Sequence, residues 1–257
     1  MQIYVCVKHV PDSAANIIIL DKNRIDENVT SLLNPYDEHA VTEAVRIRDT
    51  FQDSEVIAVC LGKDDAEKTV RSALAMGADR GILITGSGDH DSIETARALK
   101  AAMDQGETGK PALIFTGKES IDSEGMQTMF RLGALFDIPV ATNVTKIDIK
   151  ASRAIVDQEF SGGIVNTYEL SMPCVIGAGR GLNTPKYPTF PDIVKSKKKL
   201  VEKITFADLN IKPLKASAKI VELEPLEQAR SPKEITGDAS VVAQKILKIL
   251  KQEAKVI

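Results

Sequence analysis

The sequence predicts an α/β fold in which a mostly parallel β-sheet carries helices on both faces. Two observations lead to this prediction. Short β-branched, apolar runs alternate with segments of helical periodicity through the first half of the chain, and the connections between them are short. The runs are apolar at successive positions, which is typical of strands that are buried on both faces. An open, mostly parallel sheet satisfies both observations.

The strands of this sheet are expected at residues 3–7, 55–61, 81–85 and 112–116. Helices are expected between them, each with an apolar face whose side chains recur every three or four residues. These faces are Ala40, Val41, Ala44, Val45 and Phe51; Val70, Ala73 and Leu74; Ile93, Ala96, Leu99 and Met103; and Met126, Met129, Phe130 and Gly133.

The pattern changes after Pro139, where apolar and polar residues alternate. Residues 144–149, 154–160 and 164–170 therefore predict antiparallel strands added to the same sheet, and Gly162-Gly163 predicts the turn between the last two. Residues 173–177 predict a further buried strand. A Gly- and Pro-rich loop and a lysine-rich turn of helix are expected after it.

The last part of the chain has little apolar periodicity before a terminal amphipathic helix, which carries Val241, Val242, Ile246, Leu247 and Leu250. We expect an α/β domain at residues 1–204, with a loop at 178–200, and an extended C-terminal arm at 205–257. The arm cannot bury its apolar face on itself, so we expect it to pack on another chain.

Composition argues against several functional classes. The chain has 257 residues and a formal net charge of −3, whereas a dedicated nucleic-acid binder is normally basic. No apolar stretch approaches the roughly 20 residues that span a bilayer, and no leader sequence is seen. Cys6, Cys60 and Cys174 lie in separate apolar runs, which suits buried thiols in a reducing compartment. We expect a cytoplasmic protein without membrane insertion and without a nucleic-acid partner.

Three loops are expected to meet at the carboxyl-end edge of the sheet, where open parallel sheets bind ligands. They are residues 8–12, 34–37 and 117–125. The third combines two glycines, hydroxyl and acidic side chains and a following helix start, which would suit an adenosine and its phosphate. Asn34 and Asp37 fit a helix N-cap and first turn, a pattern that also occurs without any ligand.

The familiar catalytic and phosphate-binding motifs are missing. The segment 177–181 begins like a dinucleotide fingerprint but continues with Leu182, and 161–163 resembles an ATP pyrophosphatase loop without its expected acid and serine. The histidines lack the spacing of a zinc site, and Cys174 has no histidine near it in sequence. No catalytic residue and no metal site is predicted, which favours a binder or carrier over a self-sufficient enzyme or an ATP-dependent ligase.

Four separated motifs make the prediction specific: residues 34–37, 73–81, 117–122 and 182–199. Together they resemble the beta subunits of electron transfer flavoproteins, from Ile3 to about Leu209. The resemblance implies an adenine-nucleotide-binding, Rossmann-like fold paired with an alpha subunit that carries FAD. It also implies a redox carrier that is not catalytic alone.

The same resemblance implies the residues that contact the cofactor, many of them through main-chain groups. They are Cys6, Asn34, Pro35, Tyr36, Asp37, Leu61, Gly117, Lys118, Ser120, Ile121, Asp122, Ser123, Gly125, Gln127 and Thr128. Most of them belong to the loops expected at the sheet edge, which is independent support from the strand pattern.

The loop at 178–200 resembles the segment with which this family grips a partner dehydrogenase. Phe190 stands at the position of the apolar anchor, and the other partner-binding residues implied are Leu182, Pro191, Lys195 and Lys198. Two plainer interpretations stay open. Phe190 would then pack under its own loop, and the lysines would be a solvated helix face.

Val10-Pro11-Asp12 together with Asp37 resembles the anaerobic branch of the family. That branch holds a second FAD in the beta subunit, takes electrons from NADH and bifurcates them to ferredoxin and to an acyl-CoA or hydroxyacid dehydrogenase. The first alternative is a non-bifurcating carrier with AMP in the same site. An alternative of another class is a nucleotide-binding sensor or stress protein, which would need no alpha subunit.

Overall fold

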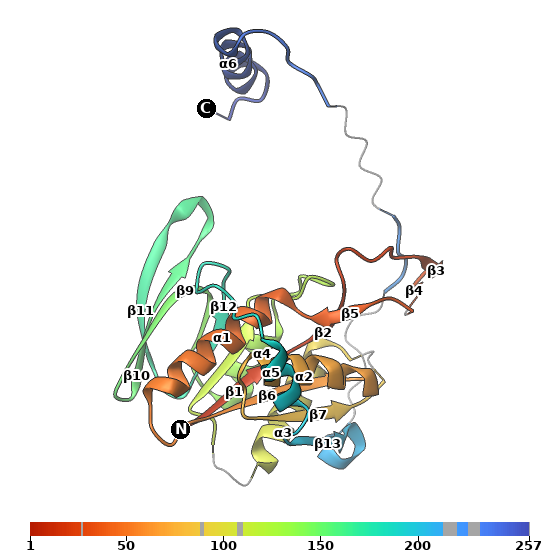
Figure 1. Cartoon of the computed structure of the whole chain (residues 1–257), viewed down its shortest axis with the longest axis vertical. Coiled ribbons are helices and arrows are strands. Elements are labelled where there is room, and N and C mark those ends of the chain that lie inside the picture. Colours follow the sequence, from red (N-terminus) through yellow and green to blue (C-terminus); the bar gives the residue numbers. More distant parts are fainter. Residues whose placement is uncertain (27, 88–89, 107–109, 213–219, 226–231, 257) are drawn as a thin grey trace.

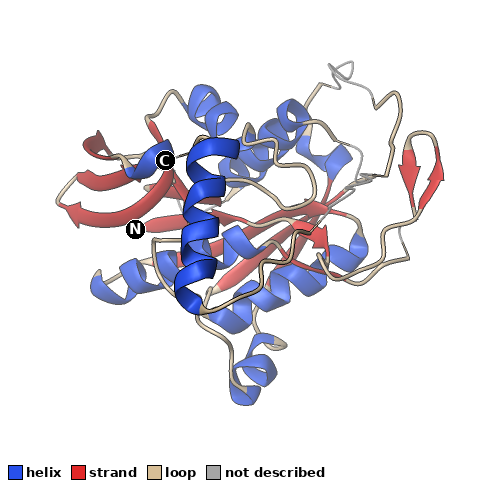
Figure 2. Ribbon diagram, turned by 90° about the horizontal axis from the view of Figure 1, so that it is seen from above, coloured by secondary structure: helices blue, strands red, loops and turns tan. Residues whose placement is uncertain are grey.

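The computed structural model describes residues 1–26, 28–87, 90–106, 110–212, 220–225 and 232–256. These residues form a nine-stranded sheet and two small two-stranded sheets. Figure 2 shows helices on both faces of the large sheet, so the predicted α/β class is confirmed.

The large sheet has the strand order β11-β10-β9-β12-β8-β1-β6-β7-β13. Every neighbouring pair from β9 to β13 is parallel, and β10 is antiparallel to both β9 and β11. The strands are β1 (Gln2–Cys6), β6 (Glu55–Gly62), β7 (Arg80–Thr85), β8 (Leu113–Gly117), β9 (Val140–Lys150), β10 (Arg153–Glu159), β11 (Val165–Ser171), β12 (Cys174–Ala178) and β13 (Val201–Thr205).

The four predicted parallel strands, the three antiparallel ones and the buried strand at 173–177 are confirmed, including the turn at Gly162-Gly163, where both glycines have positive φ. One strand of the large sheet was missed, as were the short strands within residues 9–33 that form the two small sheets. β13 pairs in parallel with β7 at the edge of the sheet. Its middle residues Glu202 and Lys203 are exposed, so it lacks the apolar run that marks a buried strand.

Four helices cover the sheet: α1 (Pro35–Thr50) and α2 (Glu67–Met76) on one face, and α3 (Ser92–Gln105) and α4 (Thr128–Phe136) on the other. The predicted faces of the first three supply buried core residues. The predicted face of α4 is wrong in part. Met126 precedes the helix with φ 52°, and Phe130 is 47% exposed. The core face is instead Met129, Leu132 and Gly133, because the helix begins only at Thr128.

The remaining described elements are small. Residues 9–33 contribute the antiparallel pairs β2 (His9–Pro11) with β5 (Ser31–Leu33), and β3 (Ile19–Asp21) with β4 (Arg24–Ile25). Helix α5 (Phe190–Ser196) begins before the lysines that suggested it. A turn of helix at Phe206–Leu209 buries Leu209 against the body.

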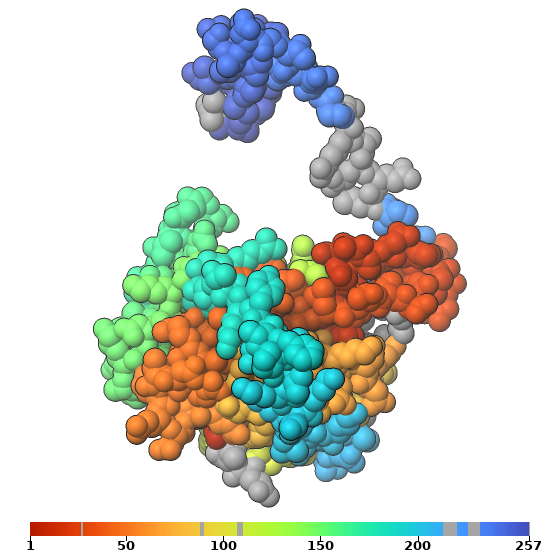
Figure 3. All heavy atoms as spheres, viewed as in Figure 1, coloured from red at the N-terminus to blue at the C-terminus, as the bar shows by residue number. Residues whose placement is uncertain are grey.

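The predicted terminal helix is present as α6 (Ala239–Lys248), followed by a π-helical turn at Ile249–Glu253. None of the residues of α6 is buried, and Figures 1 and 3 show it apart from the α/β body. Residues 213–219 and 226–231 of the predicted arm lie outside the described residues. Within the described part of the chain, no helix has the length and apolar character that crossing a membrane requires.

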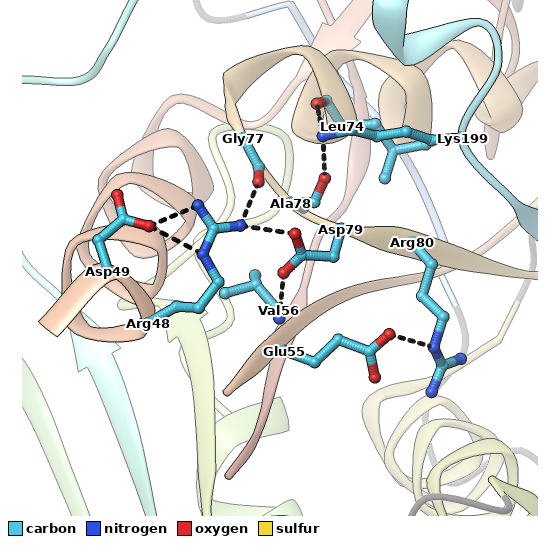
Figure 4. Close-up of polar contacts among 10 residues, drawn as sticks. All are labelled: Arg48, Asp49, Glu55, Val56, Leu74, Gly77, Ala78, Asp79, Arg80 and Lys199. Atoms are coloured by element: carbon cyan, nitrogen blue, oxygen red, sulfur yellow. Dashed lines mark hydrogen bonds and ion pairs between the residues drawn. The ribbon is translucent and has the colours of Figure 1, made fainter. Parts of the chain in front are cut away.

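Residues 73–81, one of the motifs behind the family resemblance, form a structural clamp at the amino ends of the strands (Figure 4). Arg48 of α1 donates to the carbonyl of Gly77 at 2.8 Å and to Asp79 at 2.7 Å. The other oxygen of Asp79 accepts from the main-chain N–H of Val56 at 2.8 Å. Gly77 has φ 131°, a conformation that glycine adopts without strain. This motif therefore joins α1, α2 and β6 and does not contribute to the opposite edge.

Replacing Asp79 by Ala should lower the free energy of unfolding by roughly 1–3 kcal/mol, because both the Arg48 guanidinium and the Val56 N–H lose a partner. Asp49 is the matched control, since it pairs with the same guanidinium but is 62% exposed. Asp49→Ala should cost less than about 0.5 kcal/mol. Urea unfolding followed by circular dichroism measures both, and equal effects would contradict the clamp.

Candidate functional site

The three loops predicted at the carboxyl ends of the strands come together in the structure, and Asp37 is the side chain that joins them. It is 5% exposed, near the start of α1. One carboxylate oxygen accepts from the main-chain N–H of Lys8, after β1, at 2.8 Å. The other accepts from the N–H of Gly117, at the end of β8, at 2.9 Å. A single buried carboxylate therefore fixes the ends of two strands relative to one helix.

Gly117 is required by this close approach. A Cβ at this position would lie 2.5 Å from the Asp37 carboxylate and 2.6 Å from the Cβ of Tyr36. Any other residue would push α1 away from β8 or break the hydrogen bond to Asp37. The glycine thus allows the helix start to sit directly over the end of the strand.

Asn34 occupies the predicted N-cap position of α1, but its side chain makes no capping hydrogen bond. Its amide nitrogen donates to the carbonyl of Glu119 at 2.9 Å, and its amide oxygen accepts from the N–H of Ile121 at 3.2 Å. The side chain is almost completely buried. The predicted cap is therefore wrong in its partner, because Asn34 orders the loop after β8 and leaves the helix start open.

Lys8 makes a third connection that the sequence reasoning missed as a site residue. Its ammonium donates to Asp122 at 2.8 Å and to Ser120 at 3.2 Å, with Ser123 at 3.4 Å. Burial tends to raise the pKa of Asp122, but the hydrogen bonds from Lys8 and Ser120 outweigh it and the pKa is lowered. The signal available in the sequence was a lysine directly after a buried strand, which points at the edge where ligands bind.

Two cations flank Tyr36 on the same edge. Lys118 lies 5.2 Å and Arg180 5.0 Å from the centre of its ring. Lys118 also pairs with Glu119 at 3.1 Å, and Arg180 comes directly after Gly179 at the end of β12. The edge therefore carries positive charge beside the loop that Asp37, Asn34 and Lys8 hold in place.

The other residues predicted to contact the cofactor divide into buried and exposed ones. Cys6 is buried at the end of β1, and burial raises the pKa of its thiol far above the ordinary value, so the thiol is unreactive. Leu61 is half-buried near the end of β6. Ser123 and Gly125 are exposed, and nothing lies within 4 Å of a Cβ placed at Gly125. Pro35 and Thr128 are the first residues of α1 and α4.

Gln127 is predicted to contact the cofactor, but in the structure its side chain bonds to residues of α3 and α4. Its side-chain oxygen accepts from Arg131 at 2.6 Å and from Ser92 at 3.2 Å. It therefore ties the start of α4 to α3. Because it makes no side-chain cap, the first N–H groups of α4 have no capping side chain.

The histidines make separate structural contacts and do not converge on the edge. His9 lies 2.7 Å from the hydroxyl of Thr69, and His39 lies 3.1 Å from the amide oxygen of Asn183. Among the described residues, no group of three histidine, cysteine or acidic side chains is arranged to hold a metal ion.

A second surface is formed by the loop after β12. Asn183 donates to the carbonyl of His39 and to Glu43, both at 3.0 Å, which fixes the loop to α1. Phe190 is the first residue of α5, where Thr189 and Asp192 form a capping box. Its side chain is 78% exposed. The plainer interpretation, that Phe190 packs under its own loop, is therefore wrong.

The other predicted partner residues differ in exposure. Pro191, Lys195 and Lys198 are exposed near Phe190, and Tyr187 is 80% exposed beside them. Leu182 instead packs against the hydrophobic core under α1. It holds the base of the loop, so the exposed apolar surface lies further along, where Tyr187 and Phe190 are joined by Ile193, Val194 and Leu200.

Comparison with known proteins shows the family to which the chain belongs. The family model described as the electron transfer flavoprotein domain matches residues 23–209. The chain is 31% identical to the electron transfer flavoprotein subunit beta of Bacillus subtilis, with both chains covered completely. It is 36% identical to the mitochondrial subunit beta of Arabidopsis thaliana, also over both full lengths. It is 35% identical to the subunit beta of Mus musculus, over 91% of this chain and 93% of that one.

The protein is thus a member of the electron transfer flavoprotein family. Within that family it is a beta subunit, a component of an electron carrier.

Burial raises the pKa of Asp37 from 3.8 to about 7, although the hydrogen bonds from Lys8 and Gly117 oppose this. The unfolded chain releases the proton at the lower pKa, so the stability associated with the protonated carboxyl is lost as pH rises from 3.8 to about 7.

Measured against Asp37→Asn, which does not titrate, the stability of the wild type should fall by roughly 1 kcal/mol or more over this range. Urea unfolding at fixed ionic strength and several pH values gives the difference. A difference that is flat with pH would show that the carboxyl keeps its ordinary pKa.

Proposed function

We propose that the edge formed by residues 8–12, 34–37 and 117–128 binds an adenylate-bearing cofactor, FAD or alternatively AMP. The observation that carries the proposal is a set of hydrogen bonds to the loop after β8. Asp37, Asn34 and Lys8 belong to other segments of the chain, and they hold this loop in one conformation. A loop that is already ordered loses less entropy when a ligand binds. The cofactor-contacting residues are those predicted from the family resemblance, with Lys8 added.

The residues present fit such a cofactor. The uncapped start of α4 favours a phosphate through its N–H groups and dipole. Lys118 and Arg180 add positive charge nearby, and Ser120 and Ser123 supply hydroxyl groups. The open surroundings of Gly125 leave space for a ligand beside the main chain. A flavin bound here would supply the redox chemistry, while the protein positions it and sets its surroundings.

We propose further that the subunit takes electrons from NADH and bifurcates them to ferredoxin and to an acyl-CoA or hydroxyacid dehydrogenase. The support is the sequence pattern of Val10-Pro11-Asp12 and Asp37. In the structure Pro11 lies in β2, and the Asp12 carboxylate accepts from the N–H of Ala14 at 2.9 Å. Asp37 acts on main-chain groups. It therefore shapes the edge for either cofactor, and a non-bifurcating carrier with AMP is the alternative.

The obligatory partner in this proposal is an electron transfer flavoprotein alpha subunit. The support is the C-terminal helix α6, none of whose residues is buried, with Val241, Ile246 and Leu247 more than 40% exposed. An amphipathic helix in this state gains stability when it covers its apolar face with another chain. The buried thiols of Cys6, Cys60 and Cys174 suit a cytoplasmic location. A sensor or stress protein of similar fold would need no such arm.

Counting cofactors tests the choice between FAD and AMP. The chain is purified with its alpha subunit, and FAD and AMP are quantified per heterodimer after denaturation. Two FAD, with NADH oxidation, is the expected result, whereas one FAD and one AMP would refute bifurcation.

Asn34→Ala should remove only the beta-site cofactor, because it releases Glu119 and Ile121. Asn183→Ala, which frees a loop on α1, should leave the count unchanged.

Changing Phe190 to Ala should slow electron transfer to the partner dehydrogenase, because the exposed aromatic is the proposed anchor. The expected change is roughly a tenfold increase in the apparent KM for the carrier, with the cofactor count unchanged. The assay follows electron transfer from the NADH-reduced heterodimer to a purified acyl-CoA dehydrogenase. Loss of cofactor from the variant would show that Phe190 has a folding role instead.

A further inference from the structure

The loop that carries Phe190 is attached to α1 through Asn183, and it has a second attachment on α2. Arg71 of α2 donates through one guanidinium nitrogen to the carbonyl of Ser196 at 2.9 Å and to the carbonyl of Lys199 at 2.7 Å. Ser196 is the last residue of α5 and is 3% exposed. Arg71 therefore caps the carboxyl end of α5, where a helix leaves carbonyl groups without partners.

Lys199 makes the reverse connection (Figure 4). Its ammonium donates to the carbonyls of Leu74 at 3.0 Å and Ala78 at 2.6 Å, at the carboxyl end of α2. Each of the two helices thus has its carboxyl-end carbonyls capped by a cation that the other segment supplies. We call this pair of contacts, made by Arg71 and Lys199, the reciprocal cap. Hydrogen bonds from a charged donor to a carbonyl are among the stronger ones in proteins.

The reciprocal cap adds tertiary contacts at the carboxyl end of α5. This helix has seven residues, and helices of that length are marginal in water without tertiary contacts. Its amino end is closed by the Thr189–Asp192 cap, and its carboxyl end is closed by Arg71. Phe190 is the first residue of α5 and is largely exposed, so its direction depends on the helix being formed and fixed to α2.

We propose that Arg71 and Lys199 are positioning residues for partner docking. They touch neither the partner nor the cofactor, and they hold α5 so that Phe190 projects in one direction before the partner arrives. This inference rests on the proposed docking role of Phe190. A pre-ordered anchor binds more tightly because less conformational entropy is lost on association.

The experiment uses the complete alpha–beta heterodimer and the variants Arg71→Met, Lys199→Met and Phe190→Ala, with Arg71→Lys as the conservative change. Methionine keeps an unbranched stem without the donor. Lys68→Met is the control, since Lys68 is an exposed cation on the same helix. Two experiments are made on each variant: hydrogen–deuterium exchange of residues 187–199, and steady-state measurement of kcat and KM for electron transfer from the NADH-reduced heterodimer to acyl-CoA dehydrogenase.

Arg71→Met and Lys199→Met should speed exchange in residues 187–199 by roughly tenfold or more while exchange in β1 and β6 stays slow. They should raise KM about as much as Phe190→Ala does and leave kcat near the wild-type value. Combining Arg71→Met with Phe190→Ala should add little to KM, because both act on one contact. Arg71→Lys should restore part of the effect.

Three results would overturn the inference. One is unchanged exchange in α5 without the reciprocal cap. The second is faster exchange with an unchanged KM in the same variants while Phe190→Ala raises it. The third is an additive effect of Arg71→Met and Phe190→Ala. If Phe190→Ala itself leaves KM unchanged, the docking role in the proposed function fails first, and the inference falls with it.

Discussion

A buried carboxylate that binds two main-chain N–H groups is the contact on which the candidate site depends. Asp37 joins the end of β1 to the end of β8, with the start of α1 between them. A carboxyl group loses most of its hydration when it is buried, and the two N–H donors here compensate for part of that loss while the pKa stays raised. The close approach in turn requires glycine at position 117. The edge of the sheet therefore has a defined shape before any ligand is bound.

The polar contacts at the two ends of the sheet stabilise different parts of the structure. At the carboxyl ends, Asn34 and Lys8 add to the contact made by Asp37, and polar side chains hold a loop from several directions. At the amino ends, Arg48 and Asp79 join two helices and a strand in the same manner. The motif at 73–81 that resembles the family so closely belongs to this second end. A motif can therefore identify a family through its architecture alone.

The proposed partner surface is built on a different physical principle from the proposed cofactor edge. Its apolar group, Phe190, is exposed, and polar contacts from two helices hold the segment that carries it. Burying the aromatic in its own protein would stabilise the free subunit but leave nothing to offer a partner. The chain instead fixes the backbone with charged and amide groups. The cost of ordering the segment is met during folding of the subunit.

The sequence by itself determined the α/β class, the strands that are apolar throughout, most helix faces and the family, because periodicity and contiguous motifs are local properties. The tertiary structure alone decided that Asn34 bonds a loop 85 residues away, that Lys8 reaches Asp122, and that Phe190 is exposed. It also decided that the polar segment at 201–205 is an edge strand. Each of these depends on which segments become neighbours. Strand order and packing set that relation, and no single stretch of sequence contains it.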